Sequence, residues 1–320
     1  EEVFTETDAW YESSYDNAGV RINARDSWHL TKTLPFVLGE FRWTGFDYIG
    51  ESGGWPRVLG NFGIIDLCNF PKDTYYFYQS QWTDKPMIHI LPHWNWPGKE
   101  GTAIPVHAYT TGDEAELFLN GQSLGVRRFG GDNPYHLEWL VPYTPGELKA
   151  VARKDGEVMA THVIQTAGTP VKFDFETDQT ELDPRDRDLA YLTIRVEDAE
   201  GNFHPKAARW VSIQIKGPAR ILGVHNGDPL SHEPFQSRTV KTFNGLARVI
   251  LAATTGKDTV GKNEEREPGE IVVTARVRGW ESKTLRLRRT HEGTEASVFP
   301  PDNSAPRPTD VYDEGVPPVD

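Results

Sequence analysis

The sequence predicts a mainly β protein, in which a short α/β segment precedes two β-sandwiches. Three observations support this fold class. Residues 1–85 read as a strand, a helix and a second strand without alternation, which is typical of a parallel α/β unit. Residues 86–167 contain two hairpin signals, and residues 168–290 contain several strands with strict apolar/polar alternation.

Composition limits the function classes. The chain has 320 residues, enough for two or three domains that each bury a core. Its 10 Trp, 11 Tyr and 15 Phe exclude a disordered chain. The formal net charge of −13 argues against nucleic acid as a partner, because a basic surface is needed to displace phosphate counterions. A neutral sugar is compatible with this charge.

Membrane and redox signals are weak. No window approaches the ~20 apolar residues of a membrane span, so we expect no membrane partner. The single cysteine, Cys68, lies in an apolar run and is expected to be a buried thiol. No signal peptide is recognisable, and the start Glu1-Glu2-Val3-Phe4 is unlike a native N-terminus, so we expect residue 1 to lie inside a longer gene product.

The first element group is the α/β segment of residues 1–85. Val3-Phe4-Thr5 reads as a short buried strand. Residues 26–34 read as a short helix, with Asp26 as its N-cap and Pro35 closing it, and Phe36-Val37-Leu38 as a further strand. Two strands cannot close a sheet, so the rest of this α/β unit is either missing or lies in another chain.

The second group is the predicted sandwich of residues 86–167. Leu117 and Leu119 precede Asn120-Gly121, a two-residue hairpin turn. Asp155-Gly156 predicts a second hairpin. Antiparallel β structure of this length is typical of one sandwich.

The third group, residues 168–290, predicts an immunoglobulin-like sandwich. Apolar and polar residues alternate over residues 192–196, 211–215 and 271–277, as in half-buried strands. Residues 198–201 predict a turn and residues 256–269 a highly charged loop. Residues 291–320 are rich in Pro and acidic side chains, as in a linker or tail.

The most informative chemistry lies between Thr5 and Glu51. Carboxylates stand beside Trp and Tyr at the predicted strand ends, and a sugar site needs this combination. Aromatic faces stack on a pyranose, and carboxylates accept its hydroxyls or attack its anomeric carbon. Taken residue by residue, the plain alternatives stay open: Glu6 as a solvated loop acid, Trp43 as core, and Asp47 and Glu51 as capping or pairing groups.

The run GEFRWTGFDYIGE at residues 39–51, followed by residues 55–82, strongly resembles family 2 glycoside hydrolases of the β-galactosidase type. Asn69 stands where the family commonly has Gly. Further segments resemble, in the same order, the two domains that follow the barrel in this family: residues 92–98, 116–125, 167–170, 188–191, 226–229 and 243–245.

This resemblance implies a fold and a reaction. The fold is the C-terminal end of a (β/α)8 TIM barrel at residues 1–85, then immunoglobulin-like β-sandwich domains at residues 86–167 and 168–290, with a tail at residues 291–320. The reaction is retaining exo-hydrolysis of terminal β-D-galactosides through a glycosyl-enzyme intermediate. β-Glucuronidase is the alternative within the family. No cofactor and no metal is implied.

Residue roles follow from the same resemblance. Glu6, in the context Thr5-Glu6-Thr7, matches the nucleophile, and Trp43 matches the platform under the cleaved sugar. Asp47 and Glu51 match supporting or hydroxyl-binding positions, with structural and functional roles equally open.

Two further positions and one gap complete the prediction. Trp94 and Trp96 are candidate substrate contacts, with packing between barrel and sandwich slightly favoured. The acid/base Glu of the family belongs to an Asn-Glu pair that would precede residue 1. Asn263-Glu264 follows no apolar strand and is not taken as that pair. The chain alone is therefore expected to be inactive, because general acid catalysis contributes ~10²–10⁴ in rate.

The expected partners are an oligosaccharide or β-galactoside substrate and the missing N-terminal half of the enzyme, with a homo-oligomer left open. The family resemblance favours a periplasmic or secreted location.

Two other function classes stay open. One is a carbohydrate-binding module on Trp139, Trp210 or Trp280, each of which is better explained by packing, and the other is a purely structural or assembly role. Histidine spacing suggests no metal site, neither at His89 and His93 nor around Asp228.

Overall fold

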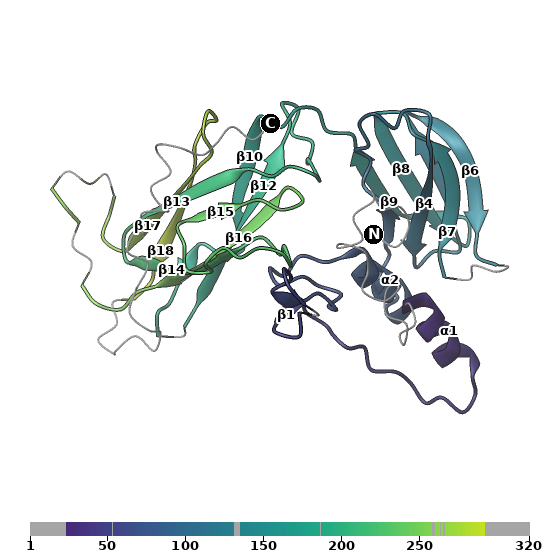
Figure 1. Cartoon of the computed structure of the whole chain (residues 1–320), viewed down its shortest axis with the longest axis horizontal. Helices are drawn as coiled ribbons and strands as arrows, with labels where there is room; N and C mark the ends of the chain where they lie inside the picture. Colours follow the sequence, from purple (N-terminus) through teal and green to yellow (C-terminus); the bar gives the residue numbers. More distant parts are fainter. Residues whose placement is uncertain are drawn as a thin grey trace. The chain divides into compact units, whose positions relative to one another are not determined.

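A computed structural model describes residues 24–52, 54–130, 135–185, 187–257, 260–262, 264 and 266–291 of the chain. It divides into two compact units, residues 1–166 and residues 167–320 (Figure 1). Among the described residues, no helix has both the length and the apolar character needed to cross a membrane.

The first unit begins with a segment of two helices and two short strands, residues 24–82. It contains α1 (Ala24–Thr33), β1 (Tyr48–Ile49), β2 (Leu59–Gly60) and α2 (Asp73–Trp82), with β1 and β2 paired antiparallel. The aromatic helix α2 buries Phe77 and Tyr78 against Leu91 and Tyr109 of the following sandwich. The helices therefore pack against that sandwich, and Figure 1 shows them next to it.

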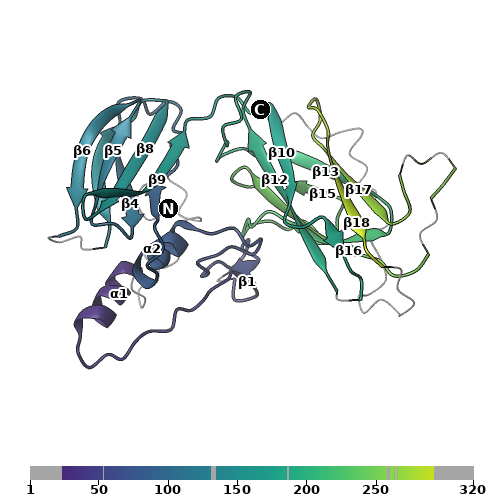
Figure 2. The same ribbon diagram turned by 180° about the vertical axis from the view of Figure 1, so that it is seen from behind.

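The first sandwich consists of two antiparallel sheets. One sheet has the order β3-β4-β7 (Ile88–Leu91, Ala103–Thr110, Leu137–Pro142). The other has the order β6-β5-β8-β9 (Gln122–Arg128, Glu114–Leu119, Glu147–Lys154, Glu157–Gln165), and its four strands are seen side by side in Figure 2. Alternate residues of both sheets, among them Ile104, Val106, Leu117 and Leu148, are fully buried and form one core between them.

Both predicted hairpins of this sandwich are confirmed. Asn120-Gly121 joins β5 to β6 with φ of 50° and 80°, and Asp155-Gly156 joins β8 to β9 with φ of 51° and 84°. Positive φ at both central residues defines a type I′ turn, whose twist matches that of the flanking strands.

The second unit is another two-sheet sandwich. Its first sheet has the order β10-β12-β16-β14 (Lys172–Thr177, Leu189–Glu197, Leu246–Ala253, Ala219–His225). Its second has the order β11-β18-β17-β13-β15 (Glu181–Leu182, Lys283–Arg289, Glu270–Arg276, Trp210–Lys216, Thr239–Lys241). The three predicted alternating strands correspond to β12, β13 and β17, and their apolar residues form the core. The mainly β fold class is therefore confirmed.

Two local predictions for residues 24–82 are wrong. The helix spans Ala24–Thr33, so Asp26 lies in its first turn rather than at its N-cap, where it still complements the positive end of the helix. Phe36-Val37-Leu38 is not a strand: the amide of Val37 donates to the Leu34 carbonyl in a turn, and Phe36 is 80% exposed. A strand needs a hydrogen-bonded neighbour, and none of the described residues provides one there.

Candidate functional site

The segment that carries the sugar-site motif folds back on itself. The amides of Ile64 and Ile65 donate to the carbonyls of Thr44 and Gly45 at 3.2 and 3.0 Å, and the amide of Asp47 donates to Ile65 at 2.9 Å. These bonds hold residues 44–47 beside residues 63–65. The motif is thereby attached to the tract that follows it in the sequence, and its side chains are positioned from this junction.

Asp47 is the anchor of this junction. Its side chain is 1% exposed and accepts from Lys72 Nζ at 2.7 Å and from the Gly63 amide at 2.8 Å. Lys72 Nζ also donates to the Asn61 carbonyl at 3.2 Å. Burial raises the pKa of Asp47, and the Lys72 ammonium only partly offsets that rise. The buried ion pair joins the motif to the loop before α2, so Asp47 has a positioning role within the described residues.

Gly63 is required by the same junction. A Cβ built on Gly63 would lie 2.2 Å from the Asp47 amide nitrogen and 2.6 Å from the Ile65 carbonyl oxygen. Both neighbours are backbone atoms that cannot move aside. Only glycine lets the two chain segments approach closely enough for the Gly63–Asp47 hydrogen bond.

Trp43, Tyr48 and Glu51 form a group beside this anchor. The Trp43 ring is 69% exposed and meets Tyr48 edge to face, with ring centroids 6.1 Å apart. The Tyr48 hydroxyl donates to Glu51 Oε2, and Glu51 adopts a φ of 42° directly after Gly50. An exposed indole face next to a tyrosine–carboxylate pair offers the stacking surface and the acceptor that a pyranose requires.

Glu40 is a residue of the motif that the sequence did not single out. Its Oε2 accepts hydroxyl hydrogen bonds from Ser27 and Thr31 of α1, each at 2.8 Å. The Tyr78 hydroxyl lies 3.5 Å from Oε1. The carboxylate therefore ties the start of the motif to both helices, which leaves it a structural role in the described segment.

Trp94 and Trp96 are placed differently from the expectation that they contact substrate. They are 1% and 3% exposed and belong to the core of the first sandwich. The Trp94 indole donates to the Thr144 carbonyl at 3.0 Å, and the Trp96 indole donates to the His93 carbonyl at 2.8 Å. Rings buried on both faces leave no surface for a sugar, so we exclude both from the candidate site.

Several predictions fall outside the part of the chain that the structure describes. These are the nucleophile Glu6, its neighbours Thr5 and Thr7, the Asn263 of Asn263-Glu264, and the tail from residue 292. Cys68 is described, and its predicted burial is confirmed.

The described sandwich surfaces do not present a carbohydrate platform. Trp139 is 2% exposed, and Trp280 packs on the second core with Phe173, their ring centroids 6.5 Å apart. Within the described ranges, no Trp or Tyr of residues 86–291 is exposed. Flat exposed strips of aromatic rings are the feature that a binding module needs, so the packing interpretation of these tryptophans is the better one.

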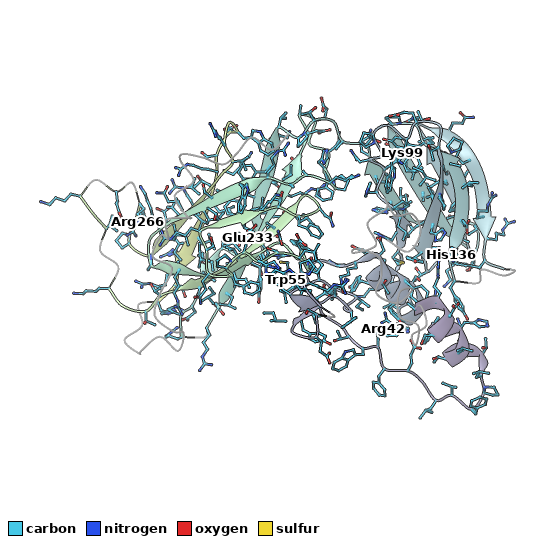
Figure 3. All side chains as sticks on the ribbon, in the orientation of Figure 1. Arg42, Trp55, Lys99, His136, Glu233 and Arg266 are labelled. Carbon is cyan, nitrogen blue, oxygen red and sulfur yellow. The ribbon has the colours of Figure 1, made fainter. Side chains whose placement is uncertain are left out.

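The turn at residues 226–230 also has a local explanation. The Asp228 amide donates to Asn226 Oδ1 at 3.0 Å, and the Leu230 amide donates to Asp228 Oδ1 at 2.8 Å. These are the side chain-to-backbone bonds of Asx turns. Burial raises the pKa values of Asp228 and of Glu233, which is labelled in Figure 3.

Comparison with known proteins identifies the family. The model of glycoside hydrolase family 2 C-terminal domain 5 matches residues 173–286, and a domain of unknown function, DUF4982, matches residues 101–160. The chain is 40% identical over 281 residues to β-galactosidase BoGH2A of Bacteroides ovatus, covering 86% of this chain and 31% of that protein.

Two further relatives agree. A provisionally named β-glucuronidase of Formosa agariphila is 43% identical over 242 residues, which is 74% of this chain and 23% of that protein. The crystal structure of a β-glycosidase from Bacteroides vulgatus superposes with a TM-score of 0.78 at 41% identity, covering 87% of this chain and 34% of that one. The chain spans about a third of the length of such relatives. It belongs to glycoside hydrolase family 2 and corresponds to the C-terminal region of these enzymes.

Proposed function

We propose that this chain is the C-terminal part of a retaining exo-β-glycosidase that hydrolyses terminal β-D-galactosides. The observation that carries the proposal is the group around Trp43: an exposed indole and the Tyr48–Glu51 pair, held in place by the buried Asp47–Lys72 ion pair. In a TIM barrel, such groups at strand ends carry substrate binding and catalysis.

In the proposed reaction, the Glu6 carboxylate attacks the anomeric carbon and the glycosidic bond to the leaving oxygen breaks. A second Glu, in the part of the enzyme before residue 1, protonates that oxygen and then activates the water that hydrolyses the glycosyl-enzyme ester. The two carboxyl groups would lie about 5–5.5 Å apart, as double displacement requires. Trp43 would stack under the sugar being cleaved.

The exposed apolar side chains of residues 24–82 support a longer catalytic domain. Leu38 and Phe41 are fully exposed, and Trp55, labelled in Figure 3, is 83% exposed. Soluble proteins rarely leave so many large apolar side chains uncovered within one short segment. We infer that the preceding strands and helices of the barrel cover part of this set in the full-length polypeptide.

We take β-galactosidase as the first candidate, because BoGH2A combines 40% identity with a match to 86% of this chain. A relative named as a β-glucuronidase is 43% identical over 74% of this chain, so β-glucuronidase is the second candidate. A glucuronide carries a carboxylate that needs a cation in the site. Lys72 is already paired with Asp47, whereas Arg42 lies in the motif and Arg57 shortly after it, so both activities are tested.

The test uses the full-length polypeptide with nitrophenyl β-galactoside and nitrophenyl β-glucuronide. We expect a higher kcat/KM for the galactoside, and at least a thousandfold loss in Glu6→Gln, because an amide cannot form the glycosyl ester. Glu2→Gln changes the same charge in the same segment and should leave activity unchanged. Trp43→Ala should lower kcat/KM about tenfold through lost ring stacking.

Two results would refute this proposal. Full activity in Glu6→Gln would show that Glu6 is not the nucleophile. A higher kcat/KM for the glucuronide would show that the substrate is a β-glucuronide rather than a β-galactoside. The intact mass of the native protein gives an independent check, since a mass near 36.1 kDa predicts no hydrolysis until the upstream part of the enzyme is added.

A further inference from the structure

We propose that His107, His136 and Glu138 form a binding site for a divalent transition metal ion, with Zn²⁺ the best match to their chemistry. We call these three residues the His-His-Glu cluster. Their ligand atoms all lie within 4.8 Å of one another on the first sandwich, where His136 is labelled in Figure 3. The metal proposal does not depend on the proposed glycosidase activity.

Strand pairing brings the cluster together. His107 on β4 is the direct cross-strand partner of Glu138 on β7, so their side chains lie on the same face of the sheet. His136 lies directly before β7, two residues ahead of Glu138, and its ligand atom lies within 4.8 Å of those of His107 and Glu138. The two imidazole rings have centroids 4.1 Å apart. The sheet backbone therefore preorganises all three side chains.

The distances suit a tetrahedral ion. Glu138 Oε2 lies 3.5 Å from His107 Nε2 and 3.6 Å from His136 Nε2. With Zn–N and Zn–O bonds of about 2.0–2.2 Å, tetrahedral geometry separates two ligand atoms by roughly 3.3–3.6 Å. Two imidazoles and one carboxylate supply three of the four ligands, and water can supply the fourth.

His136 provides an independent indication of a ligand. Its side chain is 5% exposed, and its Nε2 is buried without a hydrogen-bond partner. The Glu138 oxygen at 3.6 Å is too far for a hydrogen bond. Buried polar atoms normally have a hydrogen-bond partner. His136 Nε2 lies near a second imidazole and a carboxylate, and a cation bound between these groups would supply the missing partner.

Arg25 of α1 opposes the ion and provides the sharpest test. Its guanidinium lies 3.4 Å from His107 Nδ1. A metal on Nε2 requires the hydrogen on Nδ1, so Arg25 could no longer donate there, and its charge repels a cation. Arg25→Gln removes the charge and offers a carbonyl oxygen to the Nδ1 hydrogen, which is the usual support of a metal-bound histidine.

The experiment is calorimetric titration of Zn²⁺ into the tag-free 320-residue chain after treatment with a chelator. We expect one ion per chain, and at least a tenfold weaker affinity in Glu138→Gln and His136→Gln. Arg25→Gln should bind at least tenfold more tightly. His232→Gln, which changes an exposed histidine of the second unit, should bind as the parent does. X-ray absorption of the zinc complex should show two imidazoles in the coordination shell.

Absence of binding, or an unchanged affinity in both Glu138→Gln and Arg25→Gln, would overturn the proposal. A misfolded variant could imitate the losses, but it could not imitate the gain expected for Arg25→Gln. Thermal unfolding supplies a second readout, because an ion that binds only the folded state raises the Tm. Zinc should raise the Tm of the parent chain and of Arg25→Gln but not that of Glu138→Gln.

Discussion

Replacing Lys72 with Met tests whether the buried Asp47–Lys72 pair holds the motif together. The substitution keeps the length of the side chain but removes the cation 2.7 Å from Asp47 Oδ1. Asp47 is 1% exposed, so its carboxylate would be left buried with the Gly63 amide as its remaining donor among the contacts of this junction. Breaking a buried pair from one side costs about 3–5 kcal/mol.

Two features of the structure make the expected loss in free energy of unfolding smaller than this range. Lys72 is 22% exposed, so water already weakens the pair. Burial raises the pKa of Asp47 even beside Lys72, so the carboxyl can take up a proton when the cation is gone. We therefore expect a loss of about 2–3 kcal/mol near neutral pH. Because protonation relieves the buried charge, the loss should be smaller at pH 5 than at pH 8.

Hydrogen exchange measured by mass spectrometry on peptides that span residues 44–72 reports this local stability, because several amides of that segment donate across the junction. A loss of 2–3 kcal/mol corresponds to about 30- to 140-fold faster exchange. Lys85→Met removes an exposed lysine outside the pair and should change exchange little. Adding Asp47→Asn to Lys72→Met should restore much of the protection, since the amide oxygen can still accept from Gly63.

Less than threefold faster exchange in Lys72→Met would refute this reasoning. A double variant that exchanges as fast as the single one would refute it equally, because the cost is assigned to the unpaired charge and not to lost packing.

Three further predictions concern single positions. Gly63→Ala should unfold the same junction, because its Cβ would lie 2.2 Å from the Asp47 nitrogen; exchange of that segment should approach the unprotected rate. Burial raises the pKa of Asp66 to about 6, so the folded state binds more protons than the unfolded state between about pH 4 and 6, and local stability should fall as pH rises through that range. Asp66→Asn should remove this dependence in exchange measured across pH. Gly245→Ala should lower the Tm of the second unit, because φ is +77° and the new Cβ would lie 2.3 Å from the His204 carbonyl oxygen; a Tm within 1 °C of the parent would contradict it.

The sequence predicted the sandwiches well because their signals are local. Strand alternation over residues 192–196 and the Asn120-Gly121 turn depend on neighbours within a few residues, and the structure confirms both. The strand expected at Phe36-Val37-Leu38 failed because a parallel strand depends on distant partners, which three apolar residues cannot specify.

The site was less predictable from sequence. Asp47 and Lys72 are 25 residues apart, and only the fold-back of the chain at Gly63 shows that they pair. Spacing rules for metal ligands missed the His-His-Glu cluster because His107 and Glu138 meet across two strands. The His136-x-Glu138 pattern at the start of β7 was the available signal. The adjacent prolines made Trp94 and Trp96 resemble exposed loop residues, but both rings lie in the core of the first sandwich.

The central claim is that a family 2 glycosidase uses Glu6 as its nucleophile. The most direct measurement is covalent trapping: incubate the full-length polypeptide with a 2-deoxy-2-fluoro β-galactoside bearing a good leaving group, digest it, and locate the added mass. We expect one fluorosugar per chain, on the peptide that contains Glu6, with loss of activity in proportion to labelling. A label on another carboxylate, or steady hydrolysis without any covalent adduct, would contradict it.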